Sequence, residues 1–280
     1  MVSNLMGPKI LLQGDSGAGK TYALATVVEW AARQTPPRDV FILFTENGLE
    51  TLLGYWRDRG AEVPANLHWH VVATPVLDLK ALTEAATKVG MLSYEALTKL
   101  SDPNRMLNNP YERILKTFAD FPDDRTGKKF GNIGTWKADV VLGIDSLTQL
   151  ADACMKMVIG NKPTAAPPDY GVAQNNLMNL LRYLTQGFPP TLVMTAHVDR
   201  LEDEISRTVK LTTKSIGRAL AADIPPLFSE VLFAYREGTQ WFWDTASPSA
   251  VTKTRYLPVQ AKNKPDLGVI MDKWVSRGVV

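Results

Sequence analysis

The feature that most constrains this chain is a glycine-rich segment near its N-terminus, from Gly14 to Thr21. This segment satisfies every fixed position of the pattern G-x-x-x-x-G-K-[ST]. An apolar, strand-like run (9–13) precedes it, and a segment of helical character (21–33) follows it. Glycines let the backbone turn tightly enough to point several N–H groups inward, and the helix N-terminus adds partial positive charge. The sequence therefore predicts a phosphate-binding loop, or P-loop, between a strand and a helix.

The residues of this loop have distinct expected roles towards ATP and Mg²⁺. Lys20 is expected to reach the β- and γ-phosphates, and the hydroxyl of Thr21 is expected to contact Mg²⁺. The nucleotide-binding cradle is formed by the whole segment: Gly14, Asp15, Ser16, Gly17, Ala18, Gly19, Lys20 and Thr21.

Beyond the loop, apolar runs of strand length alternate with segments of helical period, which is typical of a mostly parallel sheet flanked by helices. Strands are predicted at 40–44, 67–72, 140–144, 191–196 and 231–235, and helices at 49–59, 79–100 and around 177–184. The segment 101–137 is polar and rich in turn formers, and we interpret it as an insertion. With 280 residues, 45% of them hydrophobic, the chain can bury one sizeable core. The prediction is a single α/β domain over residues 1–280.

Composition excludes some classes of protein. The single cysteine, Cys154, cannot form an internal disulfide. The apolar groups near the N-terminus are far shorter than a signal peptide or a membrane span, so a soluble, cytoplasmic protein is expected. A net charge of +2 gives no overall attraction to nucleic acid or membrane, so such binding would depend on local clusters.

The acidic residues distinguish among P-loop classes. The hydrophobic strand that ends in Asp145 is the Walker B arrangement, with Asp145 holding Mg²⁺ directly or through water; the simpler interpretation is a helix N-cap. Ser146 follows, where AAA+ motors usually carry their water-activating carboxylate. Glu46, just after the predicted strand 40–44, is the best candidate for that base, although it could be an ordinary loop carboxylate.

At these residues the chain resembles the RecA/RadA and replicative-helicase class of ATPases, in which the catalytic glutamate follows the strand after the P-loop helix. The resemblance implies a RecA-like core and a γ-phosphate-sensing role for His197, where histidine replaces the usual glutamine. It also implies that Lys262 and Lys264 reach into the ATP site of a neighbouring subunit. Small phage-encoded RecA-like proteins, which are linked to single-strand annealing and recombination, are similar over most of residues 8–265.

The resemblance implies an ATPase that binds single-stranded DNA and acts as a homo-oligomer, a ring or a filament, in recombination, annealing or replication. A single-stranded-DNA-binding protein is a further possible partner, no membrane is expected, and the compartment is the cytoplasm of the host cell if the chain is phage-encoded. Two alternatives stay open: an ATP-driven assembly or loading factor with a protein partner, and a nucleotide-regulated switch with little turnover.

The expected DNA contact lies in the segment 205–218, which contains four basic residues and no acid: Arg207, Lys210, Lys214 and Arg218. In a helix these residues would fall close to one stripe, but the β-branched residues between them make an extended loop an equal alternative. A cluster of Arg125, Lys128 and Lys129 is a second candidate.

Other residues invite functional interpretations that we consider weaker. Trp241 and Trp243 alternate on a strand-like segment, and packing of a late strand is preferred to base stacking. His68 and His70 share one strand face, but no further ligand of suitable spacing supports a metal site.

Overall fold

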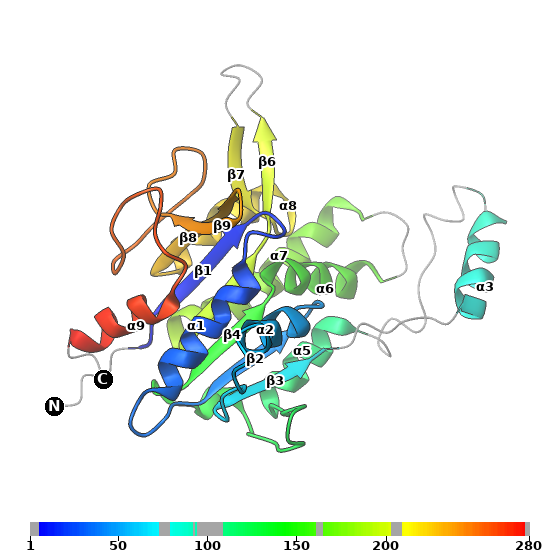
Figure 1. Cartoon of the computed structure of the whole chain (residues 1–280). Coiled ribbons are helices and arrows are strands. Elements are labelled where there is room, and N and C mark those ends of the chain that lie inside the picture. Colours follow the sequence, from blue (N-terminus) through cyan, green and yellow to red (C-terminus); the bar gives the residue numbers. More distant parts are fainter. Residues whose placement is uncertain are drawn as a thin grey trace.

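The computed structural model describes residues 6–72, 79–91, 93, 109–160, 165–202 and 209–277. Its centre is a seven-stranded sheet in the order β3-β2-β4-β5-β1-β8-β9 (Figure 1). The strands of this sheet are β1 (Lys9–Gly14), β2 (Val40–Phe44), β3 (Leu67–Val71), β4 (Val141–Asp145), β5 (Thr191–Ala196), β8 (Glu230–Glu237) and β9 (Gln240–Asp244). Every neighbouring pair is parallel except the β8–β9 hairpin. The predicted α/β class, with a mostly parallel sheet flanked by helices, is confirmed.

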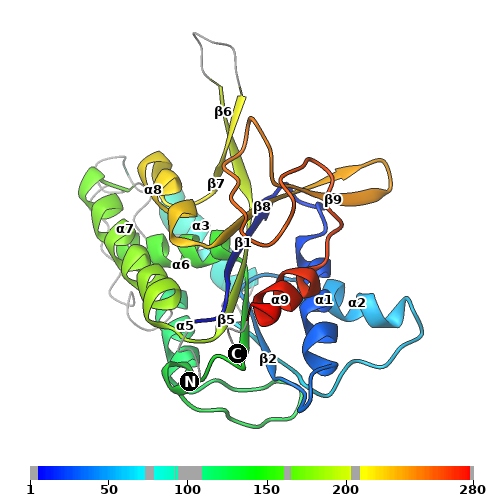
Figure 2. The same ribbon diagram turned by 90° about the vertical axis from the view of Figure 1, so that its left-hand side faces the viewer.

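Helices cover both faces of the sheet (Figure 2). On one face, α1 packs against α2 and α9, and on the other, α6 packs against α5 and α7. The helices are α1 (Lys20–Ala32), α2 (Leu49–Arg57), α3 (Leu79–Gly90), α5 (Pro110–Ala119), α6 (Leu147–Ile159), α7 (Pro167–Arg182), α8 (Gly217–Asp223) and α9 (Leu267–Ser276). Within the described part of the chain, no helix is long and apolar enough to cross a membrane.

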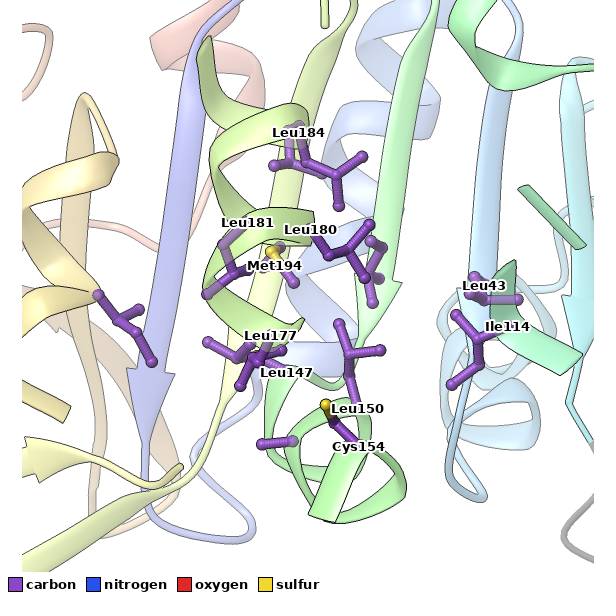
Figure 3. Packing of buried hydrophobic residues seen from close by; sticks show 14 of the residues in the cluster. Leu43, Ile114, Leu147, Leu150, Cys154, Leu177, Leu180, Leu181, Leu184 and Met194 are labelled. Atoms are coloured by element: carbon purple, nitrogen blue, oxygen red, sulfur yellow. The ribbon is translucent and has the colours of Figure 1, made fainter. Parts of the chain in front are cut away.

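Alternate side chains of each strand point to opposite faces of the sheet. Because helices cover both faces, the strands are buried on both sides. In β1, Leu11 joins the apolar cluster under α5, α6 and α7, whereas Ile10 and Leu12 join the cluster under α1, α2 and α9. The leucine stripe of α7 packs onto the first cluster (Figure 3). Its members follow the predicted i, i+3, i+4, i+7 spacing, continued into the short π-helix η2 (Tyr183–Gly187): Leu177, Leu180, Leu181 and Leu184.

The segment interpreted as an insertion is part of the core where it is described. Helix α5 begins at an Asn109 cap, whose side chain accepts hydrogen bonds from two backbone N–H groups of the first turn. Tyr111, Ile114 and Phe118 from this helix are buried in the cluster under α6 and α7. The prediction missed α5 because turn-forming residues dominate the segment around it; residues 101–108 lie outside the described residues.

The two histidines of β3 bind aspartates of the loop that follows α5. His68 Nδ1 lies 3.1 Å from Asp123 Oδ2, and His70 Nδ1 lies 2.8 Å from Asp124 Oδ1. Among the described residues, no group of three or more His, Cys, Asp or Glu side chains is arranged to hold a metal. The histidines therefore fasten residues 120–132 to the sheet edge.

The segment after β5 forms a second, two-stranded sheet that projects from the body in Figure 1: β6 (Val198–Glu202) and β7 (Val209–Thr213), which pair antiparallel. The helical alternative for this segment is therefore wrong over residues 209–213. Its β-branched residues, Val209, Thr212 and Thr213, favour the extended backbone that the alternative interpretation predicted.

Candidate active site

The P-loop closes the carboxyl end of β1 and leads directly into α1. Gly17 and Gly19 have φ values of 76° and 78°, a left-handed conformation that glycine adopts without a steric penalty. Lys20 is buried at the start of α1, and its Nζ donates to the carbonyl oxygens of Gly14 and Asp15 at 2.9 and 2.8 Å. Burial lowers the pKa of Lys20, and the acids Asp145, Glu46 and Asp15 oppose this shift. A cavity of about 460 Å³ lies over the loop.

The predicted magnesium residues meet beneath this cavity. The Thr21 hydroxyl donates to Asp145 Oδ2 at 2.8 Å, and the Thr195 hydroxyl donates to Asp145 Oδ1. Burial raises the pKa of the Asp145 carboxyl, and the hydrogen bonds from the two hydroxyls act in the opposite direction. A hydroxyl beside a buried carboxylate is a set of hard oxygen donors that fits Mg²⁺, which usually takes one or two protein ligands and completes its shell with water and phosphate oxygens. Thr21 and Asp145 are the residues that would hold it.

The segment after β2 approaches the same carboxylate closely. A Cβ added to Gly48 would lie 2.4 Å from Asp145 Oδ2, so any larger residue would force a neighbouring group to shift. Thr45 adds a further link, because its hydroxyl accepts from the Ser146 N–H at 2.9 Å. The sequence assigned neither residue a role, since close approach between distant segments leaves no periodic signal.

Glu46 and His197, which follow β2 and β5, line the same cavity. His197 Nε2 lies 3.8 Å from Glu46 Oε2. The neighbouring His197 imidazole is the main cause that lowers the pKa of the Glu46 carboxyl, and partial burial opposes it. A carboxylate that stays ionised beside the phosphate cradle has the charge state of a general base.

The structure places Trp241 at this site, although packing was the predicted role for both tryptophans of β9. Trp243 is buried and packs against the cluster under α1, as predicted. Trp241 remains 38% exposed, lines the phosphate cavity, and donates from Nε1 to the Gly17 carbonyl oxygen at 3.1 Å. Sequence alone could not predict this contact, because it depends on the sheet order. β8 lies between β1 and β9, and this arrangement brings the start of β9 beside the P-loop.

The two C-terminal lysines lie outside the phosphate cavity of their own chain. Lys262 pairs with Glu237 at the end of β8, and this contact raises the pKa of the lysine. Lys264 lines a neighbouring cavity with Tyr22 and Trp241. The role of both lysines in an adjacent subunit stays a prediction.

Three of the four residues predicted to contact DNA lie in the described chain, all of them exposed: Lys210, Lys214 and Arg218. Lys210 lies on β7, Lys214 follows that strand, and Arg218 lies in the first turn of α8. Arg207 lies outside the described residues. The alternation of β7 puts residues 210 and 212 on one face of the hairpin, together with Asp199, the cross-strand partner of Thr212. Lys214 Nζ lies 3.9 Å from Asp199 Oδ1, which brings Lys214 to the same face.

The alternative basic cluster is engaged in local structure. Arg125 donates to the carbonyl oxygens of Val63, Pro64 and Leu67, at 3.2, 2.7 and 3.3 Å. Lys129 pairs with Asp120 at 2.6 Å. These contacts hold residues 120–132 against the sheet edge.

Comparison with known families agrees with this geometry. Residues 6–256 match a family, AAA_24, described as an AAA domain. The chain belongs to this family. It is therefore an AAA-type P-loop ATPase domain, and the matched span includes the P-loop, Glu46, Asp145 and His197.

Other comparisons add little to the AAA family assignment. A similar solved structure is described as a prototypical ATPase from the type III secretion system of pathogenic bacteria. The two chains share 15% identity with a TM-score of 0.39, and the match covers 81% of this chain and 52% of that one. This chain thus spans about half the length of that protein, and so distant a likeness carries no functional conclusion. The sequence matches no curated protein.

Proposed function

We propose that this chain is a Mg²⁺-dependent ATPase of the RecA-like class that binds single-stranded DNA. On this proposal it acts as a homo-oligomer in recombination, strand annealing or replication. The observation that supports hydrolysis is the shared cavity, in which the P-loop, Glu46 and His197 face one another above the Thr21–Asp145 pair. Lys20 would neutralise phosphate charge, and Glu46 would accept a proton from the attacking water.

The DNA-binding part of the proposal is supported by the hairpin that follows His197. Lys210 and Lys214 lie on one exposed face of this hairpin, where they could contact successive phosphates. Arg200, on β6, forms an ion pair with Asp15 of the P-loop at 3.0 Å. Because the hairpin is connected to the nucleotide site both by the chain and by this pair, nucleotide binding could change its affinity for DNA.

One observation favours a second function, an assembly or loading factor that binds a protein partner. The lysine face of the hairpin also carries Asp199, which pairs with Lys214, so its charge is mixed. Phosphate backbones select uniformly positive surfaces, whereas protein partners accept mixed ones.

A filter-binding experiment with labelled single-stranded DNA distinguishes the two functions. It compares the protein alone, the protein with a slowly hydrolysed ATP analogue and Mg²⁺, and a Lys20→Ala variant under both conditions. The RecA-class proposal expects DNA retention that rises with the analogue in the parent and stays at the nucleotide-free level in Lys20→Ala. Failure of the parent to retain DNA at low salt would favour the loading factor.

A further inference from the structure

A second cavity, of about 470 Å³, adjoins the phosphate cavity. The two share three lining residues, Gly19, Tyr22 and Trp241, so they meet along the start of α1. Its volume lies within the range of small-molecule sites in proteins, roughly 300–1,000 Å³. The second cavity therefore lies directly beside the phosphate cavity.

Aromatic rings form the boundary between the two cavities. The Tyr22 and Trp241 ring centroids lie 5.6 Å apart with planes inclined at 30°, and Tyr55 lies 4.8 Å from Tyr22. The Trp241 indole is fixed against the loop by its hydrogen bond to the Gly17 carbonyl. Gly19 allows this approach, since a Cβ there would lie 2.9 Å from Trp241 Cδ1. The rings are thus held in place and do not wait for a ligand to position them.

A planar cation borders the second cavity. The Arg59 guanidinium lies 3.8 Å from the Tyr55 ring centroid, and its Nη1 donates to the Tyr22 hydroxyl and the Tyr55 carbonyl, both at 2.6 Å. Aromatic faces and guanidinium planes are the surfaces on which nucleobases stack, largely without base selectivity.

We propose that the second cavity binds the base of the nucleoside triphosphate, against Trp241 and Tyr22 and with Arg59 at its edge. This inference rests on the proposed function, because it assigns the rest of the same ligand. With the β- and γ-phosphates at Lys20, the α-phosphate lies at the first turn of α1, and the nucleoside continues past Tyr22. Purines are the expected bases because they present a larger stacking face than pyrimidines.

The test separates base recognition from phosphate recognition. Calorimetry measures the affinity of the Mg²⁺ complexes of ATP and of inorganic tripolyphosphate for the parent, Trp241→Ala, Trp241→Phe and Lys20→Ala. Trp241→Ala is expected to weaken ATP binding about 5- to 150-fold, the effect of losing one stacked base, and to change tripolyphosphate binding by less than about twofold. Trp241→Phe keeps a stacking face and should recover most of the ATP affinity. The matched control is Tyr170→Ala, an exposed aromatic on α7 outside both cavities.

Each outcome is decisive. If Trp241→Ala leaves ATP binding unchanged, or weakens both ligands equally, the base does not bind here. Should that variant fail to fold, ATP and inorganic tripolyphosphate are compared on the parent, and equal affinities overturn the proposal, because the nucleoside would then add nothing to binding. If the parent binds neither ATP nor tripolyphosphate, the nucleotide site itself is wrong. Two results together support both the phosphate site and the base site. Lys20→Ala loses binding of ATP and of tripolyphosphate, and Trp241→Ala loses binding of ATP alone.

Discussion

Glu46 is the residue on which the assignment of the chemical step depends. Glu46 follows β2, whereas Asp145 ends β4. The two carboxylates are close enough to interact, because β2 and β4 are adjacent and parallel. Ser146, which occupies the position that AAA+ motors usually give to their catalytic acid, instead caps α6 through its side chain. On the proposed function, Glu46 is therefore the carboxylate that would polarise water over the P-loop.

Replacing Glu46 by glutamine should separate binding from hydrolysis. The amide keeps the shape of the side chain but cannot accept the proton, so the turnover rate should fall about 10²- to 10⁴-fold while the affinity for Mg²⁺–ATP is retained. Steady-state phosphate release and equilibrium ATP binding measure the two effects. Glu50→Gln, on the exposed face of α2, is the control and should behave like the parent. Normal turnover in Glu46→Gln would exclude this residue as the base.

The neighbouring imidazole should set the acid limb of the pH–rate profile. Because His197 lowers the pKa of Glu46, the carboxylate stays deprotonated, and able to act as a base, to a lower pH than an isolated glutamate. His197→Ala should therefore move the acid limb of kcat to higher pH. Profiles of the variant, the parent and His70→Ala measure the shift; His70 pairs with Asp124 at the sheet edge, so its variant should keep the parental limb. An unmoved limb in His197→Ala would contradict this coupling.

At the scale of elements, the N-terminus of α2 is positioned by the contact between Gly48 and Asp145. Gly48→Ala places a Cβ where the Asp145 oxygen lies, so α2 must shift at an estimated cost of about 1–3 kcal/mol. Thermal unfolding measures the loss of stability. Gly171→Ala, inside α7 with nothing within 4 Å of the added Cβ, is the matched control and should gain roughly 0.5–1 kcal/mol. Similar changes in both variants would show that backbone entropy, and not this contact, decides the result.

The β6–β7 hairpin carries the prediction about DNA. Each phosphate contact on a single strand contributes about 0.7 to the slope of log affinity against log salt concentration. Changing Lys210 and Lys214 together to alanine should flatten that slope by roughly 1.4 while ATP affinity is unchanged. The matched control changes Lys116 and Lys156, exposed lysines of α5 and α6. A slope that responds equally to both double variants would remove the hairpin from the DNA contact.

For the whole molecule, the predicted parts of the site lie where parallel strands end together. The P-loop, Glu46, Asp145 and His197 come from the carboxyl ends of β1, β2, β4 and β5, and α/β sheets place ligands at that edge. The sequence motif predicted the P-loop, and the apolar runs predicted where Glu46 and Asp145 lie, whereas the role of His197 was implied only by the resemblance to RecA-like ATPases. The sequence could not predict Trp241 or Gly48, whose roles depend on strand order and on contacts between distant segments. The sequence also left the β6–β7 segment ambiguous. The spacing of its basic residues favoured a helix, whereas its β-branched residues favoured an extended backbone.

The last prediction concerns assembly, because Lys262 and Lys264 lie outside the phosphate cavity of their own chain. If they complete a neighbour's site, turnover per subunit should rise with protein concentration, and Lys262→Ala/Lys264→Ala should lose activity. Charge supplied to the transferring phosphoryl group by another subunit can be worth about 10³ to 10⁵ in rate. A sharper measurement mixes the double lysine variant with Glu46→Gln. Subunits of Glu46→Gln keep both lysines, which could complete the sites of double-variant subunits, where Glu46 is intact. We expect the mixture to release phosphate although neither variant is active alone. A mixture as inactive as its components would place the role of the lysines within one subunit.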